Sequence, residues 1–352
     1  MLIIIIALLA STLLTGLVRR YLRRRKVLDI PNGRSSHSVP TPRGGGISIV
    51  VVFLLTVLLF MQRNAISSDV TLALVGGGLT VAAAGILGDF FRVSAWLRLM
   101  LHFLAAGWAL WRLDGMGPLH LGWVIWEWGW LGHLFGLVGL VWMTNLYNYM
   151  DGINGLAGME GVCVGGFGGL FLAGSGMTGL AEVALALAGA SAGFLVWNFP
   201  ITKVFMGDVG SGFLGFVFGV LAISSGKERP GLLWCWFILL SVFIVDATLT
   251  LIRRWIAGAR WCEPHCTSAY QHAARRWGHS KVTLTIAAVN VVWLFPLGWG
   301  ARVWPAVAPL FAVVALVPLV YAAFRYAAGQ EHPPQKLRAS KPEGPLFATD
   351  KP

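Results

Sequence analysis

The stretch NLYNYMDGINGLAG (145–158) places polar residues between two long apolar runs, 131–147 and 158–175. It holds three Asn, one Asp and three Gly in a chain that otherwise avoids charge. Ionisable side chains within or at the end of an apolar span are costly, and they tend to mark function. We therefore expect this stretch to form part of a functional site at a membrane surface.

The surrounding sequence has the composition of a membrane protein. Hydrophobic residues make up 57% of the 352 residues and charged residues 12%, whereas an average soluble domain has roughly 25% charged residues. Apolar runs near the roughly 20 residues that cross a bilayer predict an all-α, polytopic protein with ten to eleven transmembrane helices. These runs lie at 1–18, 46–61, 71–87, 98–113, 131–147, 158–175, 181–197, 210–226, 231–252, 282–300 and 303–324.

The apolar runs leave no stretch long enough for a separate soluble domain. Residues 1–325 are expected to form a single membrane-embedded domain, and 326–352 a cytoplasmic, disordered tail. The first run is followed by RRYLRRRK (19–26) and lacks a small-residue cleavage site, so we expect it to stay as a helix rather than to be removed as a signal peptide.

Lys and Arg concentrate on one side of this predicted topology. With eleven spans, 22 of the 27 basic residues fall on one side, which the positive-inside rule assigns to the cytoplasm. The amino terminus is then periplasmic, and the loops rich in Gly, Asn and Asp are cytoplasmic. The net charge of +12 follows from this bias and from attraction to anionic membrane lipid, so no nucleic-acid partner is expected.

Three carboxylates lie where apolar runs meet the cytoplasmic face: Asp89, Asp151 and Asp208, each beside Gly or Asn. Any one of them could be a helix cap, but three at one face predict a catalytic role. Hard oxygen ligands beside glycine suit Mg²⁺ and the phosphates that it bridges. We expect Asp208 to bind the metal with Asn148 beside it, and we expect phosphoryl transfer as the reaction.

Polar residues on the same side could bind substrate, since basic side chains meet phosphate oxygens well. The candidates are Asn145, Asn154, Arg98, Lys203, His265, Arg275 and Arg276. A solvated basic loop that follows the positive-inside rule is the alternative for residues 263–281. Asp246 lies inside a span, seven residues before Arg253 on the same helix face, and we expect it to be structural and to pair with that Arg or its neighbours.

Four segments resemble the polyprenyl-phosphate N-acetylhexosamine-1-phosphate transferases, the WecA/MraY group of glycosyltransferase family 4. They are DIPNGRSSHSVPTPRGGG (29–46), NLYNYMDGINGLAG (145–158), VFMGDVGSGFLG (204–215) and DATLTLIRR (246–254). The segment HCTSAYQHAARRWG (265–278) is most similar to the WbpL-like branch, which starts O-antigen or related surface glycans.

This resemblance implies a multi-pass enzyme of the bacterial inner membrane with its active site on the cytoplasmic face. The enzyme would need Mg²⁺, with Mn²⁺ as a substitute. It would transfer an N-acetylhexosamine or 6-deoxy-N-acetylhexosamine 1-phosphate from a UDP-N-acetyl sugar to undecaprenyl phosphate and release UMP. The loop 263–281 would close over the donor. A homodimer is compatible with the sequence.

Three positions depart from the pattern of that family. Gly88 precedes Asp89 where the family has two adjacent Asp residues, Asn154 replaces the second Asp of its Asp-Gly-Ile-Asp-Gly motif, and Ser268 replaces the second His of its two-His motif. These changes leave open a catalytically impaired protein that acts as a lipid-binding scaffold. A lipid flippase or transporter is a weaker alternative, because its binding groups would lie near the membrane midplane.

Overall fold

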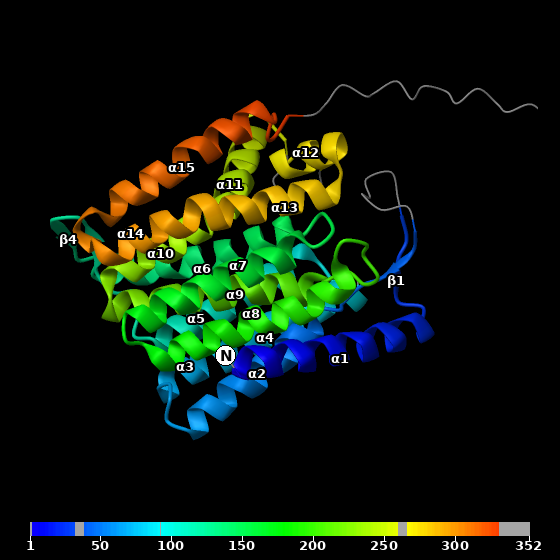
Figure 1. Cartoon of the computed structure of the whole chain (residues 1–352), viewed down its shortest axis with the longest axis horizontal. Coiled ribbons are helices and arrows are strands. Elements are labelled where there is room, and N and C mark those ends of the chain that lie inside the picture. The colour runs from blue at the N-terminus through cyan, green and yellow to red at the C-terminus, as the bar shows by residue number, and fades with distance from the viewer. Residues whose placement is uncertain (1, 32–38, 92, 260–265, 331–352) are drawn as a thin grey trace, which may run out of the picture.

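The computed structural model describes residues 2–31, 39–91, 93–259 and 266–330. These residues form a helical protein with two small ribbons (Figure 1), which confirms the expected all-α class. The helices are α1 (Leu2–Arg24), α2 (Ile47–Gln62), α3 (Ser68–Leu72), α4 (Gly78–Phe90), α5 (Ala95–Arg112), α6 (Trp130–Met150), α7 (Leu156–Gly174), α8 (Thr178–Asn198), α9 (Asp208–Glu228), α10 (Pro230–Leu239), α11 (Ser241–Ile256), α12 (Ala269–Trp277), α13 (His279–Val289), α14 (Phe295–Val303) and α15 (Ala308–Arg325).

Short irregular and extended segments join these helices. Two π-helical turns and one 3₁₀ turn interrupt the helical rods: η1 (Ala73–Gly77), η2 (Asn290–Leu294) and η3 (Pro305–Val307). Two antiparallel ribbons pair β1 (Leu28–Asp29) with β2 (Thr41–Pro42), and β3 (Leu119–Leu121) with β4 (Val124–Trp126). Residues 331–352, which make up most of the expected tail, lie outside the described residues.

Helix α9 is the centre of the bundle. Every residue from Asp208 to Gly226 is buried, and the helix contacts α2, α4, α6, α7, α8 and α10. A Cβ on Gly215 would lie 2.3 Å from the main-chain oxygen of Met143 on α6. Small residues allow such close backbone approach between helices in membranes. The first residue of α9 is therefore held in a fixed place relative to its neighbours.

Seven helical stretches in the described chain are long and apolar enough to cross a membrane, or eight if the bent pair α10–α11 counts as one span. The protein is therefore a polytopic membrane protein. The seven are 2–24, 68–90, 156–174, 178–198, 208–228, 279–303 and 305–325. Helices α2, α5 and α6 also form where runs 46–61, 98–113 and 131–147 predict them, although they are not among the seven.

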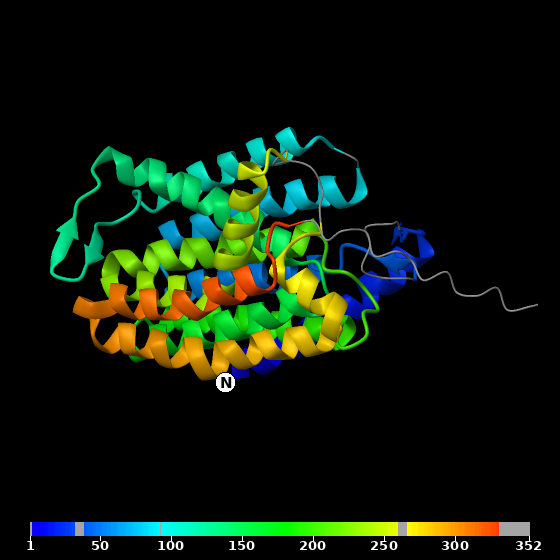
Figure 2. The ribbon, with the colours of Figure 1, turned by 90° about the horizontal axis from the view of Figure 1, so that it is seen from above.

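The predicted run 231–252 forms two helices rather than one. Helices α10 and α11 meet at Leu240 with a bend of 66°. Figure 2 shows α11 standing across the direction of the other helices. The bend brings Leu251 of α11 to the wall of a cavity that also contacts α4, α5, α6 and α9.

The two ends of the bundle differ in what they carry. Figure 1 shows β1 and α12 at one end and β4 at the other. The end with β1 and α12 also holds the last turns of α4 and α6 and the first turn of α9, which meet through side-chain contacts. We call it the motif end, and we call the end with the β3–β4 ribbon (residues 119–126) the hairpin end.

Candidate functional site

Asp89, in the last turn of α4, caps the first turn of α9. Its side chain is 0% exposed. Its Oδ1 accepts the backbone N–H of Asp208 at 3.0 Å, and its Oδ2 accepts that of Val209 at 3.2 Å. The first N–H groups of a helix lack internal partners, and a carboxylate there also interacts favourably with the helix dipole. A Cβ on Gly207, which has a φ of +77°, would lie 2.4 Å from Asp89 Oδ2, so this contact requires glycine.

Arg43 bridges the carboxylates of Asp89 and Asp208. Its Nε donates to Asp89 Oδ1 at 2.8 Å, and its Nη2 donates to Asp208 Oδ1 at 2.6 Å. The glycine run after Arg43 lies along the chain before α9, with the Gly46 N–H donating to the Met206 oxygen at 2.8 Å. Burial opposes the charge of Arg43, but Asp208 and Asp89 outweigh it and raise its pKa above the ordinary value. The guanidinium therefore stays charged.

Arg98, near the start of α5, forms an ion pair with the other oxygen of Asp208 through Nη1. The side chain of Arg98 lies against Gly88 of α4. A Cβ on Gly88 would lie 3.0 Å from Asp208 Oδ2 and 3.1 Å from Arg98 Cδ. Contacts between 3.0 and 3.4 Å are tighter than nearly all real Cβ contacts. The ion pair therefore occupies the space that a side chain at position 88 would need.

The carboxyl end of α6 supplies the polar residues of the opening stretch. Asn148 Oδ1 accepts from the Ser211 hydroxyl at 2.9 Å, which ties α6 to the first turn of α9. Asn145, one turn earlier, donates through Nδ2 to the Val141 oxygen at 2.7 Å. Asp151 follows the helix, and burial raises its pKa; Arg43 acts against this shift, while Asp208 and Asp89 add to it.

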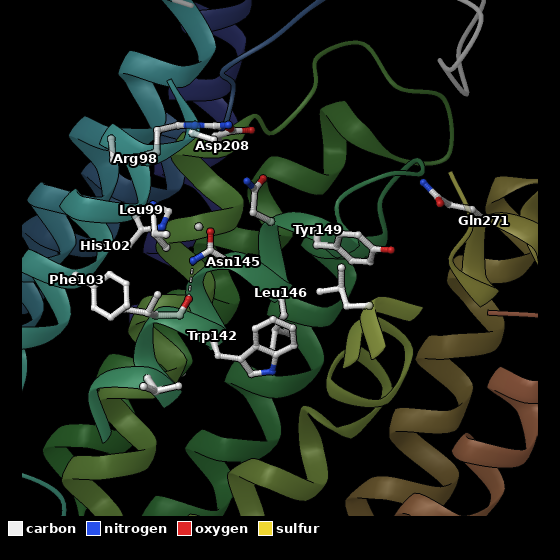
Figure 3. Close-up of a pocket in the computed structure, with 18 residues that line it drawn as sticks. Arg98, Leu99, His102, Phe103, Trp142, Asn145, Leu146, Tyr149, Asp208 and Gln271 are labelled. Atoms are coloured by element: carbon white, nitrogen blue, oxygen red, sulfur yellow. Dashed lines mark hydrogen bonds and ion pairs between the residues drawn. The ribbon is translucent and has the colours of Figure 1, made fainter. Parts of the chain in front are cut away.

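A cavity of about 570 Å³ lies beside these groups (Figure 3). Its wall is polar at one end, where Asp208 and Arg98 lie, and apolar at the other, where Phe103 and Trp142 lie. The residues that line it are Ala84, Gly85, Ala95, Arg98, Leu99, His102, Phe103, Val138, Val141, Trp142, Asn145, Leu146, Asn148, Tyr149, Asp208, Gly212, Leu251 and Gln271. Such a wall suits a molecule with a charged head and a hydrocarbon tail.

Four of the predicted binding residues that the structure describes lie outside this cavity wall: Asn154, Lys203, Arg275 and Arg276. Asn154 donates to the Pro200 oxygen at 3.2 Å and pairs with His279 Nδ1 at 3.1 Å, so it joins the loop after α6 to α13. The Lys203 Nζ lies 5.7 Å from the centre of the Trp197 ring. These contacts give Asn154 and Lys203 a place in the packing of the motif end.

The predicted donor loop is only partly described. His265 lies outside the described residues. Arg275 and Arg276 occupy the last turn of α12 and are exposed. Arg275 Nη2 donates to the Cys266 oxygen. Among described residues of this loop, Gln271 is the one that reaches the cavity wall.

Asp246 has a structural role, as expected, but its expected pairing with Arg253 or its neighbours is wrong. Its Oδ1 accepts the Ala269 N–H at 2.9 Å, and its Oδ2 accepts the Tyr270 N–H at 2.8 Å. No ion pair of Asp246 with Arg253 or Arg254 occurs in the described part of the chain. A pair of unsatisfied N–H groups at a helix start is a better partner for a buried carboxylate than a side chain seven residues along its own helix.

Comparisons with known proteins show the family of this chain. The model of glycosyl transferase family 4 matches residues 71–226. A phospho-N-acetylmuramoyl-pentapeptide-transferase of Synechococcus sp. is 32% identical over 312 residues, with 81% of this chain and 81% of the relative covered. The chain belongs to glycosyl transferase family 4. It is thus a phospho-sugar transferase enzyme.

Two further relatives are similar along most of the chain. A decaprenyl-phosphate N-acetylglucosaminephosphotransferase of Mycolicibacterium smegmatis is 27% identical over 348 residues, covering 87% of this chain and 85% of the relative. A probable undecaprenyl-phosphate N-acetylglucosaminyl 1-phosphate transferase of Bacillus subtilis is 25% identical over 258 residues, covering 71% and 70%.

The three departures from the family pattern each have a local structural role. At Gly88 the space for a carboxylate holds the ion pair between Arg98 and Asp208. Asn154 fixes the loop after α6. Ser268 caps α12 in a capping box with Gln271, and its hydroxyl bonds the Tyr149 hydroxyl at 2.8 Å. The three residues therefore fit their surroundings rather than leaving gaps.

Members of glycosyl transferase family 4 generally depend on Mg²⁺, and the donor set at the motif end fits this ion. The carboxylate of Asp208 and the amide of Asn148 face one cavity. No group of three or more His, Cys, Asp or Glu that could hold a metal occurs within the described ranges. Mg²⁺ is commonly held by one or two carboxylates together with substrate phosphates and water, so two protein oxygens suffice.

Sequence reasoning missed two residues of the site. Arg43 lies in the segment 29–46, but its residue type alone does not mark it as a binding residue. The feature of the sequence that indicates its role is its position directly before three glycines, on the same predicted side of the membrane as the carboxylates. His102 lies on the cavity wall. The feature of the sequence that could have indicated this is a polar residue within the apolar run 98–113.

Proposed function

We propose that the enzyme transfers an N-acetylhexosamine or 6-deoxy-N-acetylhexosamine 1-phosphate from a UDP-sugar to undecaprenyl phosphate. UMP is the second product. The reaction takes place at the cytoplasmic face of a bacterial inner membrane, as the first step of O-antigen or related surface glycan synthesis. The names of the relatives, which specify polyprenyl-phosphate N-acetylglucosamine phosphotransferases, support the reaction class.

The cavity is the single observation that carries this proposal. The Arg98 guanidinium and the Asp208 carboxylate lie at one end of it, and an apolar wall lies at the other. A soluble nucleotide sugar alone would not need the apolar wall. A membrane lipid alone would not need two arginines around one carboxylate. A reaction between a lipid phosphate and a nucleotide diphosphate needs both.

Each residue of the cluster has a distinct role in the proposed reaction. An oxygen of the lipid phosphate attacks the sugar-bearing phosphorus, and the bond between the two phosphates of the UDP-sugar breaks. Arg43 and Arg98 bind phosphate oxygens, and Asp89 orients Asp208 by fixing the start of α9. Asp208 and Asn148 would hold Mg²⁺, which when bound neutralises charge on the departing UMP.

The proposed topology has ten to eleven spans with the amino terminus in the periplasm. It rests on the excess of Lys and Arg beside the motif segments and on the gathering of these segments at one end of the bundle. Labelling of single Cys variants at the motif end and at the hairpin end in sealed inverted vesicles tests this arrangement.

The reaction is tested with membranes, radiolabelled UDP-N-acetylglucosamine and undecaprenyl phosphate. Release of UMP together with label in the lipid phase supports the proposal. Competition by unlabelled UDP-N-acetylhexosamines and their 6-deoxy relatives then identifies the sugar. Binding of donor without turnover, in the presence of Mg²⁺ and of each competing sugar, would overturn the proposed reaction and leave a lipid-binding scaffold.

A further inference from the structure

The side chain of Glu160 is a buried carboxyl group for which the proposed roles above give no use. It lies on α7, inside the membrane-length stretch 156–174, and the residue is 1% exposed. No ion pair of Glu160 occurs in the described part of the chain. A charged side chain inside a membrane span is costly, and such groups almost always pair with another group or mark a function.

Asn290 is the one hydrogen-bond partner of this carboxyl group among the described residues. It is the first residue of η2, inside the membrane-length stretch 279–303, and it is 0% exposed. Its Nδ2 donates to Glu160 Oε2 at 2.8 Å and to the Ile286 oxygen at 3.2 Å. An amide nitrogen carries two hydrogens, so both are used. The two acceptors also fix which end of the amide is the nitrogen.

Each of these two side chains is left with one buried oxygen that has no partner. Within the described ranges, neither Glu160 Oε1 nor Asn290 Oδ1 takes part in a hydrogen bond. Buried polar atoms are nearly always paired, and these two belong to groups that one hydrogen bond already joins. A carboxylate oxygen and an amide oxygen are both acceptors, so they cannot satisfy each other. A carboxylic acid can satisfy an amide oxygen, because its O–H is a donor.

We propose that Glu160 is a neutral carboxylic acid that forms a double hydrogen bond with the Asn290 side chain and so positions the turn between α6 and α7. The amide N–H donates to Oε2, and the acid O–H on Oε1 donates to Asn290 Oδ1. One proton then satisfies both oxygens and removes an unpaired charge from the interior of the bundle. Tyr147 of α6 and Cys163 of α7 lie near enough to interact with the carboxyl group electrostatically, and neither supplies a positive charge.

The pair belongs to a stripe of polar side chains on α13 and η2, which pack against α7 (Figure 1). His279, Thr283 and Asn290 are spaced by four and seven residues, so they share a helix face. His279 Nδ1 pairs with Asn154 Oδ1 at 3.1 Å, and the Thr283 hydroxyl donates to the Asn154 main-chain oxygen at 2.9 Å. The three contacts therefore tie one face of this span to the segment 154–160.

This stripe links the Glu160–Asn290 pair to the motif end. Asp151 lies in the turn between α6 and α7, near enough to Arg43 and Asp208 to interact with both. Thr283 holds the end of this turn, and the pair fixes the height of α13 along α7, because a slip of one residue would part the two side chains. The positioning role rests on the proposed function, in which this turn borders the site, whereas the proton and the double hydrogen bond do not.

The first test detects the proton directly, in infrared spectra of purified protein near pH 7. The carbonyl stretch of a protonated carboxyl group is separate from the bands of a carboxylate and of the amide backbone. We expect this band in wild type, with a loss of intensity in Glu160→Gln. Asn290→Leu should shift it, because the acid loses its partner. Glu182→Gln is the matched control and should leave the band unchanged, since Glu182 is exposed on α8 and an exposed glutamate is ionised near pH 7.

The second test measures the pairing with a double-mutant cycle in thermal unfolding. Glu160→Leu and Asn290→Leu each leave one buried partner unpaired, so each should lower Tm by roughly 2–6 °C. The variant with both changes loses both partners at once, and its Tm should fall by less than the sum of the two single changes. Glu160→Gln keeps a donor and an acceptor in the same places and should keep the Tm of wild type.

The third test measures UMP release well below the Tm of each variant. We expect kcat of Glu160→Leu to fall roughly tenfold, because a small displacement of groups at a site reduces the rate strongly even when the change is distant. Glu160→Gln should restore kcat, since it restores the double hydrogen bond.

Each outcome decides the matter. An infrared band that is equal in wild type and Glu160→Gln shows an ionised Glu160 and overturns the proposal. Additive effects of the two Leu changes overturn the pairing, and wild-type kcat in a folded Glu160→Leu overturns the positioning role. If Glu160→Leu fails to fold, the infrared spectra of Glu160→Gln and Asn290→Leu decide. Should wild type release no UMP with any donor, the proposed reaction fails, while the infrared and Tm measurements still test the proton and the pairing.

Discussion

The motif end and the hairpin end differ in how their side chains are surrounded: polar side chains pair with one another at the first, and aromatic side chains are exposed at the second. At the motif end, Arg43, Asp89 and Asp208 satisfy one another at 2.6–3.0 Å. At the hairpin end, Trp123 is 88% exposed and Trp130 74% exposed. Tryptophan is enriched where a membrane meets water, and there it needs only the right depth. The side chains at the motif end depend on their exact geometry relative to one another, whereas those at the hairpin end depend only on their depth in the membrane. Substitutions at the motif end should therefore reduce activity and stability more than substitutions at the hairpin end.

The largest expected effect is that of Asp208→Asn. The change removes the charge that Arg43 and Arg98 share and the carboxylate expected to hold Mg²⁺, while it keeps the shape of the side chain. We expect UMP release to fall by roughly a thousandfold or more. Detergent-solubilised protein should keep its elution profile on size exclusion. Turnover within tenfold of wild type would contradict the assignment of Asp208.

The next effect is that of Arg43→Ala, which leaves two carboxylates facing each other. We expect kcat to fall by about a hundredfold. The free energy of unfolding should fall by about 1–3 kcal/mol, below the range for a fully buried pair because the Arg43 side chain is 38% exposed. Arg43→Lys keeps the charge but cannot bridge two carboxylates in a fork. Its kcat and its free energy of unfolding should therefore lie between those of wild type and of Arg43→Ala. Thermal unfolding measures the stability of the two variants, and UMP release measures their kcat. Equal stability and equal kcat for Arg43→Ala and Arg43→Lys would argue against a bridging role.

A smaller effect is expected at Gly88. Restoring a carboxylate with Gly88→Asp would place like charge beside Asp208 and press on Arg98, since the Cβ alone meets them at 3.0 and 3.1 Å. We expect kcat to fall about tenfold, which corresponds to about 1.4 kcal/mol of barrier. Gly88→Ala, with the crowding but without the charge, should lose less. A gain in turnover for Gly88→Asp would show that the missing carboxylate limits this enzyme.

Arg275→Ala and Arg276→Ala test whether α12 closes over the donor. If the loop meets the UDP-sugar equally in the ground and transition states, KM for the donor should rise by a few fold with kcat unchanged. A single exposed charge contact contributes about 0.2–1 kcal/mol, which sets that scale. If KM and kcat both equal those of wild type, Arg275 and Arg276 do not contact the donor, and their charge reflects only the positive-inside rule.

The smallest effect is expected at the hairpin end. Trp123→Ser should leave kcat and both KM values within about twofold of wild type, because surface substitutions away from a site usually change stability by less than about 0.5 kcal/mol. A loss of turnover comparable to that of Gly88→Asp would show that the two ends of the molecule are coupled.

Most helices could be predicted from the sequence because apolar runs of membrane length have few alternatives. The break between α10 and α11 could not, since WCWFILLSVFIVD (234–246) contains no Pro or Gly. At the break the Ser241 hydroxyl donates to the Ile238 oxygen at 2.7 Å, and bonds from Ser to a preceding carbonyl often bend helices. The count of spans supported by length and apolar character is also lower than the ten to eleven expected, because α2 is only 16 residues long and α5 and α6 are less apolar.

At the site, the meeting of Asp89, Asp208 and Arg98 could be anticipated, because each follows or begins an apolar run on one side. The partner of Asp246 could not, since it is a pair of backbone N–H groups, of Ala269 and Tyr270, and every residue except Pro carries such a group. The bridge made by Arg43 could not be anticipated either, because Arg43 does not lie at the end of an apolar run as the two carboxylates do. Its pairing with residues 205–208 is a contact across more than 160 positions.

The ion pairs at the motif end also set an electrical balance. Arg43 and Arg98 carry two positive charges, and Asp89 and Asp208 carry two negative charges, while the raised pKa of Asp151 favours its neutral form. The resting cluster is therefore close to neutral and offers little net attraction to a bare nucleotide diphosphate. A UDP-sugar carries two negative charges on its phosphates, and one divalent cation cancels both. On the proposed function, the donor and its divalent cation would then approach this cluster as a neutral pair, so the cation would also aid entry of the nucleotide.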